Sequence, residues 1–561
     1  MRTPFIRSRE SDCSGKTSGT AINSRSVSME RPKPESTNAS DTHVENAAQS
    51  NEGTHIPSYS MALIRMAVLV SIGGLIFGYD TGQISGFLEM EVFLARFGER
   101  TDNLEKHPTG YYFSNVRAGL IVGLLSIGTF FGCMTSGTIA NRYGRKTTFI
   151  PWCILHCIGI IVQMTVGSGG WLGLSMGRWL SGLAVGGLSV LVPLYMTEVS
   201  PVSLRGPIIS CYQLLITMGM LIACSINFGT ERLTSPAAYQ IPMGAGFLWA
   251  GILGLGSLFL PESPRYDWYH EKPERARATM ATMYGVDQNH PAIEAEIQEM
   301  EQVREASQNR RPWYKSFAGP KIKLRTYISM QMQTLQQLTG ANFFFYYGTS
   351  IFASVGIPNS YITAMILTAV NVVGTVVGVF LARRFSRRVC LIVGGLFQAA
   401  CFLVITVVAI IPYKDAPDGS DQEKSAGIVM IVFACLFILS YASTWGPLTW
   451  ACIGEMFPYQ QRGLGMGFAT SANWFWNFML AFFTPFITAK IGFAYGFVFL
   501  GFNLSCSIFV YFFLCESTGR TLEDIDLLYL LGIRPARTRG YVFTEEDRRR
   551  GDEIRSGARL A

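Results

Sequence analysis

Long stretches without any Asp, Glu, Lys or Arg constrain the fold of this chain more than any other feature. Charge-free runs cover residues 118–140, 147–177, 179–197, 206–230, 234–261, 389–413, 425–454, 463–489 and 491–515. A run at 326–382 is divided in two by the turn sequence at 356–360, and a run at 61–87 is interrupted by Arg65 and Asp80. A helix of this length crosses a hydrocarbon core about 30 Å thick, because it rises about 1.5 Å per residue. The sequence predicts an all-α membrane protein with twelve transmembrane helices.

Basic residues gather in loops that fall on one side of this topology. The loops are residues 141–146 between spans 2 and 3, 383–388 between spans 8 and 9, and 262–325 between spans 6 and 7. Because cytoplasmic loops are enriched in Lys and Arg, this side and both termini are predicted to be cytoplasmic. The predicted organisation is a disordered cytoplasmic tail (1–57), a six-helix bundle (58–261), a cytoplasmic loop with short helices (262–325), a second six-helix bundle (326–515) and a cytoplasmic tail (516–561).

An internal repeat relates the two bundles. Residues 198–206 and 455–463 both read E-x-x-P-x-x-x-R-G, 257 positions apart. The basic turns at Arg142 and Arg384 lie 242 positions apart, and Glu262 lies 254 positions before Glu516. We therefore expect two parallel six-helix halves. Two halves that rock about a shared site are typical of a transporter rather than of an enzyme or an anchor.

Composition argues against several other classes of protein. Only 15% of the residues are charged, where a soluble domain carries about a quarter. The 12 Cys lie mostly inside apolar stretches, which argues against a disulfide scaffold, and the net charge of +7 is spread through loops, which argues against nucleic-acid binding. Cys153, His156 and Cys157 share a face of span 3 without further ligands, so we predict no metal and no cofactor.

Asp80 is a carboxylate inside the first predicted span, where it costs about 2.5–3.5 kcal/mol on insertion scales. It therefore needs a partner or a role, and Arg178 in span 4 is the best partner in the same half. One interpretation is a buried ion pair that fixes the helices in register. The other is a proton-coupling site, because protonation of Asp80 weakens the pair.

Span 7 carries the densest group of uncharged polar residues, including Gln336, Gln337 and Asn342, followed by Tyr346 and Tyr347. Amides offer both donors and acceptors, which suits a ligand with adjacent hydroxyl groups. Gly340 lies between Gln337 and Asn342, and we expect the helix to relax there so that both face one cavity. The alternative is that these amides hydrogen-bond neighbouring helices. Further binding candidates in other spans are Gln213, Asn371, Trp450 and Asn473.

Charged residues of both signs recur at the predicted cytoplasmic ends of the spans, in register with the repeat. They form a candidate latch that closes this end of the two halves, or else they only set the topology. The candidates are Arg142, Arg145, Glu198, Arg205, Glu262, Arg265, Glu455 and Arg462.

These motifs together resemble the sugar porter family of the major facilitator superfamily, and within it the fungal hexose transporters, over roughly residues 60–525. The resemblance rests on 78–82 (GYDTG), 141–146 (NRYGRK), 193–198 (PLYMTE), 261–265 (PESPR), 336–342 (QQLTGAN) and 519–523 (GRTLE). It implies that Gln213, Gln336, Gln337, Asn342, Asn371, Trp450 and Asn473 line a sugar site, that Tyr346 and Tyr347 close over it, and that Asp80 accepts the proton in a symporter. Compared with the family pattern in the two basic turns, Asn141 replaces an Asp in the first, and Arg383 and Ser386 replace an Asp and a Gly in the second. Because both carboxylates are lost, the latch there is expected to be weaker or wired differently.

The sequence thus predicts a transporter of glucose or a related hexose that works by alternating access in the plasma membrane. Its expected partners are a monosaccharide, a co-transported proton and the lipid bilayer, without nucleic acid, and it is expected to act as a monomer. Proton symport is favoured over uniport. The alternative is a transporter-like glucose sensor that binds sugar and signals without transport. No catalytic constellation assembles in the motifs, so an enzyme is not predicted.

Overall fold

The computed structural model describes residues 60–102, 109–201, 204–307, 321–354, 360–411, 421–457, 459–520 and 522–556. The chain divides into two units, Met1–Thr54 and His55–Ala561, and all of the described residues belong to the second unit. The predicted disordered tail at 1–57 lies outside the described residues.

The first half of the described chain is built from six long helices. They are α2 (Met61–Phe87), α4 (Asn115–Tyr143), α5 (Arg145–Thr165), α6 (Trp171–Val199), α7 (Arg205–Thr230) and α8 (Ala237–Ser257). Between α2 and α4 lie the short helix α3 (Glu91–Phe97) and an antiparallel pair of strands, β1 (Glu99–Arg100) and β2 (Tyr111–Tyr112), with Glu99 opposite Tyr112. Helix α6 begins seven residues before Arg178, so the charge-free run at 147–177 continues past the turn that separates α5 from α6.

Three short helices follow in the segment between the halves: α9 (Pro264–Tyr269), α10 (Pro273–Tyr284) and α11 (Pro291–Ser307). Each begins with a proline, whose fixed φ and missing N–H suit the first helical position. The Ser263 hydroxyl caps α9 by accepting a hydrogen bond from the Tyr266 backbone N–H.

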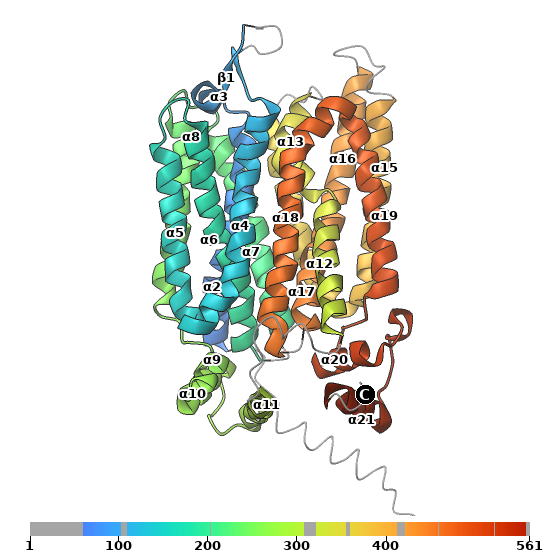
Figure 1. Cartoon of the computed structure of the whole chain (residues 1–561). Coiled ribbons are helices and arrows are strands. Elements are labelled where there is room, and N and C mark those ends of the chain that lie inside the picture. Colours follow the sequence, from blue (N-terminus) through green and yellow to red (C-terminus); the bar gives the residue numbers. More distant parts are fainter. Residues whose placement is uncertain are drawn as a thin grey trace, which may run out of the picture. The chain divides into compact units, whose positions relative to one another are not determined.

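The second half contains α12 (Ile322–Leu338), α13 (Ala341–Ser354), α14 (Ser360–Arg384), α15 (Arg387–Ile410), α16 (Asp421–Ser443), α17 (Trp445–Met456), α18 (Tyr459–Ile491), the 3₁₀ turn η3 (Gly492–Tyr495) and α19 (Gly496–Phe513). The segment predicted as a C-terminal tail contains α20 (Leu522–Leu531), the 3₁₀ turn η4 (Pro535–Arg537) and α21 (Glu545–Ser556). In Figure 1, α20 and α21 lie at the same end of the long helices as α9, α10 and α11.

Within the described ranges, ten segments are long and apolar enough to cross a membrane. One of them, Gln461–Phe513, covers most of α18 and all of α19. The pair α12 and α13 supplies a further span whose two pieces are 17 and 14 residues long. The twelve predicted spans are therefore present.

Helices α12 and α13 are interrupted at Gly340, where the sequence predicts that the helix relaxes. Gly340 has φ +94°, a conformation that residues with a Cβ rarely adopt. A Cβ at this position would also lie 2.8 Å from ring atoms of Phe402 and Phe499. The break is thus fixed both by the backbone and by packing. A second interruption, between α16 and α17 at Thr444, is not apparent from the sequence.

The helices of the two halves pair in the same way. The second helix of each half packs on the fourth (α4 on α6, α14 on α16), and the third packs on the fourth and sixth (α5 on α6 and α8, α15 on α16 and α19). The first helix packs on the fifth and sixth (α2 on α7 and α8, α12 on α18 and α19). The halves meet along α4 with α18 and along α7 with α14, and Figure 1 shows α18 beside α4. The predicted boundaries of the two bundles, 58–261 and 326–515, stay predictions.

Burial is distributed as expected for a helix bundle in lipid. Large apolar side chains such as Phe380 and Leu255 are 68% and 67% exposed, whereas polar side chains such as Arg178, Gln333 and Asn473 are buried. Lipid solvates exposed apolar side chains but offers no partner to polar ones, so the polar groups gather inside.

Candidate functional site

A network of buried amides joins α12 to α18. Gln336 donates from Nε2 to the carbonyl oxygens of Trp445 (2.9 Å) and Gly446 (3.0 Å), where α17 begins. Asn473 of α18 donates from Nδ2 to Oε1 of Gln333 (2.6 Å) and of Gln336 (3.0 Å). Two of the predicted sugar-site residues, Gln336 and Asn473, are therefore in direct contact.

The network continues across the break at Gly340. The Gln337 amide donates to Asn473 Oδ1 at 2.8 Å, and Gln337 Oε1 accepts from the Asn342 amide on α13. The break thus brings Gln337 and Asn342 together, as the sequence predicts. Five residues apart on an unbroken helix, they would face directions about 140° apart.

Asn477 extends the network to the first half. Its Oδ1 accepts from the Tyr346 hydroxyl (2.9 Å) and from the Ser126 hydroxyl of α4 (2.6 Å), and its amide donates to Gln337 Oε1 at 3.4 Å. Sequence reasoning missed Asn477 and Ser126. Because Asn477 lies one helical turn after Asn473, the i, i+4 relation was the available signal.

The remaining predicted sugar-site residues lie around this network. Tyr347 donates to the Ala481 carbonyl of α18 at 2.5 Å, so both tyrosines attach α13 to α18. Asn371 on α14 donates to the Met220 sulfur of α7 at 3.7 Å, across the contact between the halves. Gln213 on α7 lies close to Gly446, since a Cβ on that glycine would be 3.8 Å from Gln213 Nε2. Trp450 is half-buried on α17, and among the described residues it makes no hydrogen bond to the network.

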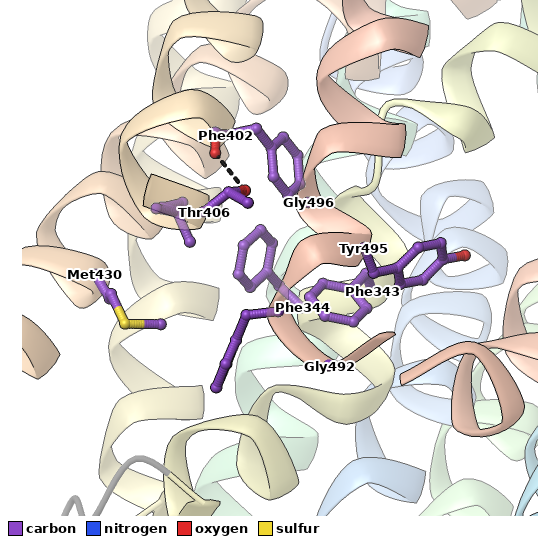
Figure 2. A pocket seen from close by; sticks show the side chains of 10 residues that line it. Phe343, Phe344, Phe402, Thr406, Met430, Gly492, Tyr495 and Gly496 are labelled. Atoms are coloured by element: carbon purple, nitrogen blue, oxygen red, sulfur yellow. Dashed lines mark hydrogen bonds between the residues drawn. The ribbon is translucent and has the colours of Figure 1, made fainter. Parts of the chain in front are cut away.

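An apolar pocket lies apart from the amides in the second half. Figure 2 shows Phe343, Phe344, Phe402 and Tyr495 around it, with Met430 at its side. The hydroxyl of Thr406, which also lines the pocket, already donates to the Phe402 carbonyl at 2.7 Å. A sugar needs several convergent polar partners, so the amide network suits it better than this pocket does.

The Asp80 carboxylate is buried on α2, with 4% of its surface exposed. Its Oδ1 accepts from the Gln83 amide at 3.2 Å, and its Oδ2 lies 3.6 Å from Nδ1 of His156 on α5. Arg178 on α6 is also buried and interacts electrostatically with Asp80, but among the described residues it makes no ion pair with it. Sequence reasoning considered His156 only as a metal ligand and missed it as a partner of Asp80.

Arg178 lies between the Asp80 region and the amide network. It interacts electrostatically with Asp80 of α2 and with Tyr346 of α13, whose hydroxyl donates to Asn477. Arg178 therefore lies near residues of both regions.

The candidate latch residues of the first half form ion pairs within that half. Arg145 binds Glu198 through two hydrogen bonds of 2.9 Å, and Glu198 also accepts from the Ser263 hydroxyl. Glu262 accepts from the backbone N–H groups of Arg145 (2.8 Å) and Lys146 (3.2 Å), at the start of α5. A carboxylate at this position satisfies helix-terminal donors and complements the helix dipole.

Arg205 and Arg265, two further latch candidates, contact the acidic residue Glu296, which sequence reasoning missed. Glu296 on α11 lies 3.0 Å from Arg205 and 3.6 Å from Arg265, and it accepts from the Tyr284 hydroxyl. Glu296 gives no sequence signal, because acids are ordinary in a polar connecting segment. The exposed Arg142 lies over the ring of Tyr143 at 5.5 Å instead of joining these pairs.

The second half repeats the arrangement at the start of α15. Glu455 pairs with Arg387, which sequence reasoning missed, and Glu516 accepts from the Arg387 backbone N–H at 3.2 Å. Ser386, which departs from the family pattern, donates to Glu516 and caps α15 by accepting from the Val389 N–H. The buried Arg462 completes the latch candidates. The pairs described here each join residues of one half to each other or to the neighbouring connecting segment.

Glu516 is expected to stabilise the protein in a pH-dependent way. Burial alone would raise the pKa of this carboxyl, but hydrogen bonds from Ser386 and Thr518 outweigh it and hold the pKa below its usual value. Its contribution is therefore present above the unfolded-state pKa and is lost as the pH falls through the lower folded-state pKa. Glu516→Gln should cost about 1–3 kcal/mol at neutral pH, and the cost should shrink in acid. Thermal unfolding in detergent across pH measures this.

The matched control is Glu262→Gln at the equivalent position of the first half. Burial raises the pKa of Glu262 despite its backbone hydrogen bonds, so neutralising it should cost less at neutral pH. An equal loss of stability in the two variants, constant over the pH range, would contradict the expectation for Glu516.

Comparisons with known proteins agree with this architecture. A family model described as "Sugar (and other) transporter" matches residues 66–529. The low-affinity glucose transporter HXT3 of Saccharomyces cerevisiae is 39% identical over 483 residues, which cover 85% of this chain and 84% of that protein. The high-affinity fructose transporter ght6 of Schizosaccharomyces pombe is 39% identical over 493 residues, which cover 87% and 91%.

The fold is also similar to a solved structure. The proton:xylose symporter XylE, determined with bound 6-bromo-6-deoxy-D-glucose, matches with a TM-score of 0.71 at 22% identity, over 84% of this chain and 100% of that one. At this identity the likeness concerns the fold. The family model covers most of the chain and the relatives align over nearly their full lengths, and they are membrane transporters rather than enzymes. The chain belongs to the sugar (and other) transporter family.

Proposed function

We propose that this protein carries a hexose, such as glucose or fructose, across the membrane by alternating access. The observation that carries the proposal is the amide network, which spans the break between α12 and α13 and reaches Ser126 of the first half through Asn477. Amides joined to one another can exchange these bonds for bonds to sugar hydroxyls without leaving a buried polar group unpaired. The glucose and fructose transporters among the relatives support the same substrate class.

The sugar is proposed to bind where the amides and aromatic rings converge. The residues assigned to it are Gln213, Gln336, Gln337, Asn342, Tyr346, Tyr347, Asn371, Trp450 and Asn473, to which the contacts described above add Gln333 and Asn477. When α13 moves away from α18, the bonds of Tyr346 and Tyr347 to α18 break and the site opens on that side. The charged residues at the other end of the halves are proposed to act as the latch.

Proton symport is proposed as the energy source, with uniport as its alternative. The support is the burial of Asp80 beside His156 and Arg178, together with the likeness in fold to XylE, which is a proton:xylose symporter. The protein is proposed to lie in the plasma membrane as a monomer, with both termini in the cytoplasm, because the basic loops fall on that side.

The test is expression in a cell that lacks its own hexose transporters. The proposal expects entry of radiolabelled glucose, blocked by competing hexoses. A competition series of sugars, run with and without a proton gradient, ranks the substrates and separates symport from uniport. If the protein reaches the surface and labelled sugar does not enter, transport is refuted, and intact sugar-dependent transcription would then identify the protein as a sensor.

A further inference from the structure

His156 is a buried ionisable residue that the proposed sugar path does not use. It is 1% exposed on α5, and its Nδ1 lies 3.6 Å from Asp80 Oδ2. Among the described residues, neither of these two atoms has a hydrogen-bond partner of its own. Buried polar atoms are rarely left unpaired, so two such atoms facing each other indicate a place for a shared proton.

The neighbouring helices leave room for the imidazole ring. On α8, Gly246 faces the opposite edge of the ring, since a Cβ on this glycine would lie 3.5 Å from His156 Nε2. The Tyr79 hydroxyl on α2 donates to the Pro242 carbonyl of α8 at 2.7 Å and so is engaged elsewhere. The ring is therefore held between α2 and α8, with Nδ1 toward the carboxylate.

Among the described residues, few charged or titratable groups lie close to the pair. Helix α6 contributes Arg178, α2 contributes Asp80 and Tyr79, and α5 itself contributes Cys153 and Cys157. Gly246 and Pro242 of α8 do not titrate, and the charged residues of α4, Arg117 and Arg142, lie near its two ends. Arg178 is thus the nearby positive charge whose interaction with Asp80 or His156 changes when either residue gains a proton.

The chemistry of the pair follows from proton counting. With a neutral imidazole and an ionised carboxylate, Arg178 balances the charge of the site. One added proton, on Nδ1 or on Oδ2, forms an N–H···O or O–H···N bond between the two side chains and makes the site net positive. When the proton leaves, that charge disappears, and no other group is consumed. The proton is then held by the two side chains together rather than by either one alone.

We propose that the coupling proton is shared between the Asp80 carboxylate and the His156 imidazole, so that His156 sets the pH range in which the proton gradient drives sugar uptake. The proposal rests on the proposed proton-coupled sugar transport.

The experiment compares the full-length protein with His156→Asn by measuring initial rates of labelled glucose uptake over external pH in a transporter-null cell. The asparagine amide takes the place of Nδ1 and can donate to Asp80, but it cannot hold the proton. Because one of two proton-accepting groups is lost, half-maximal uptake should require about a tenfold higher proton concentration. The matched control is Cys153→Ala, which lies one turn away on α5, is also buried and faces Gly254 of α8. Its pH profile should equal that of the native protein.

The outcomes separate this proposal from the proposed function. Absence of uptake by the native protein refutes transport, and uptake that ignores the proton gradient refutes both symport and the shared proton. Gradient-driven uptake whose pH profile is the same in His156→Asn, even at a lower maximal rate, overturns the role of His156 alone. If the variant does not reach the membrane, the test uses the purified native protein instead. Infrared difference spectra are recorded as the protein is acidified. Imidazole and carboxyl bands changing together support the shared proton, and a carboxyl change alone overturns it.

Discussion

Asp80→Asn is expected to abolish accumulation of sugar against its gradient while sugar exchange across the membrane continues. The amide keeps the size of the side chain and its contact with Gln83, but it cannot gain or lose a proton. One proton that moves down a membrane potential of about 100 mV supplies about 2.3 kcal/mol, enough for about 50-fold accumulation. The ratio of internal to external sugar should therefore fall from about that value to about one.

The measurement is the steady-state ratio of a labelled, non-metabolised hexose, with and without an uncoupler. Exchange of labelled for unlabelled sugar across the membrane is the control, because it needs delivery of the protein and alternating access but no proton gradient. An unchanged accumulation ratio in Asp80→Asn would exclude this carboxylate from coupling. Native uptake that is insensitive to the uncoupler would indicate uniport.

Gln337→Ala is expected to raise the KM for sugar about tenfold with normal delivery to the membrane. Gln337 contacts Asn342, Asn473 and Asn477, so it lies at the centre of the network where the two pieces of the broken helix meet. Its removal takes away contacts to the ligand and leaves neighbouring amides unpaired, which costs about 1–3 kcal/mol.

Gln331→Ala is the matched control, because Gln331 lies on the same helix and its amide donates to the Tyr327 hydroxyl rather than to α18. Concentration dependence of initial uptake rates is measured for both variants. A KM that stays at the native value in Gln337→Ala would remove this residue from the sugar site. An equal rise in both variants would point to a general disturbance of α12.

The sequence predicts the membrane-spanning helices well because the lipid core excludes charged side chains. A charged side chain in lipid is costly, so the spans coincide with runs that lack charged residues. Gly340 marks the break in the seventh span. Charge-free runs alone do not mark the end of the helix near Arg178, which is predicted to lie in span 4 and lies inside α6. Helix ends here depend on the glycine-rich turn after Thr165, which carries no charge to reveal it.

Contacts between distant spans are the part that one sequence does not reveal. His156 lies 76 positions after Asp80, and a single histidine on an apolar helix more often packs than titrates. Arg178 attracted attention because it interrupts an apolar run, whereas a neutral imidazole does not. Asn477 was recoverable by helical spacing, but the role of Glu296 required the fold of the connecting segment to bring it to Arg205 and Arg265.

The ionisable residues around Asp80 all lie on α2, α5 and α6, whereas the amides that join Gln336 to Asn473 lie on α12 and α18. In the proposed scheme, the proton-coupling residues lie in the first half and most of the sugar-site residues lie in the second, with Gln213 of α7 as the exception, and the two groups are connected where Tyr346 and Ser126 meet Asn477. If these proposed sites are correct, most substitutions that change the preferred sugar should fall in the second half, and they should leave the proton-coupling residues of the first half unaltered.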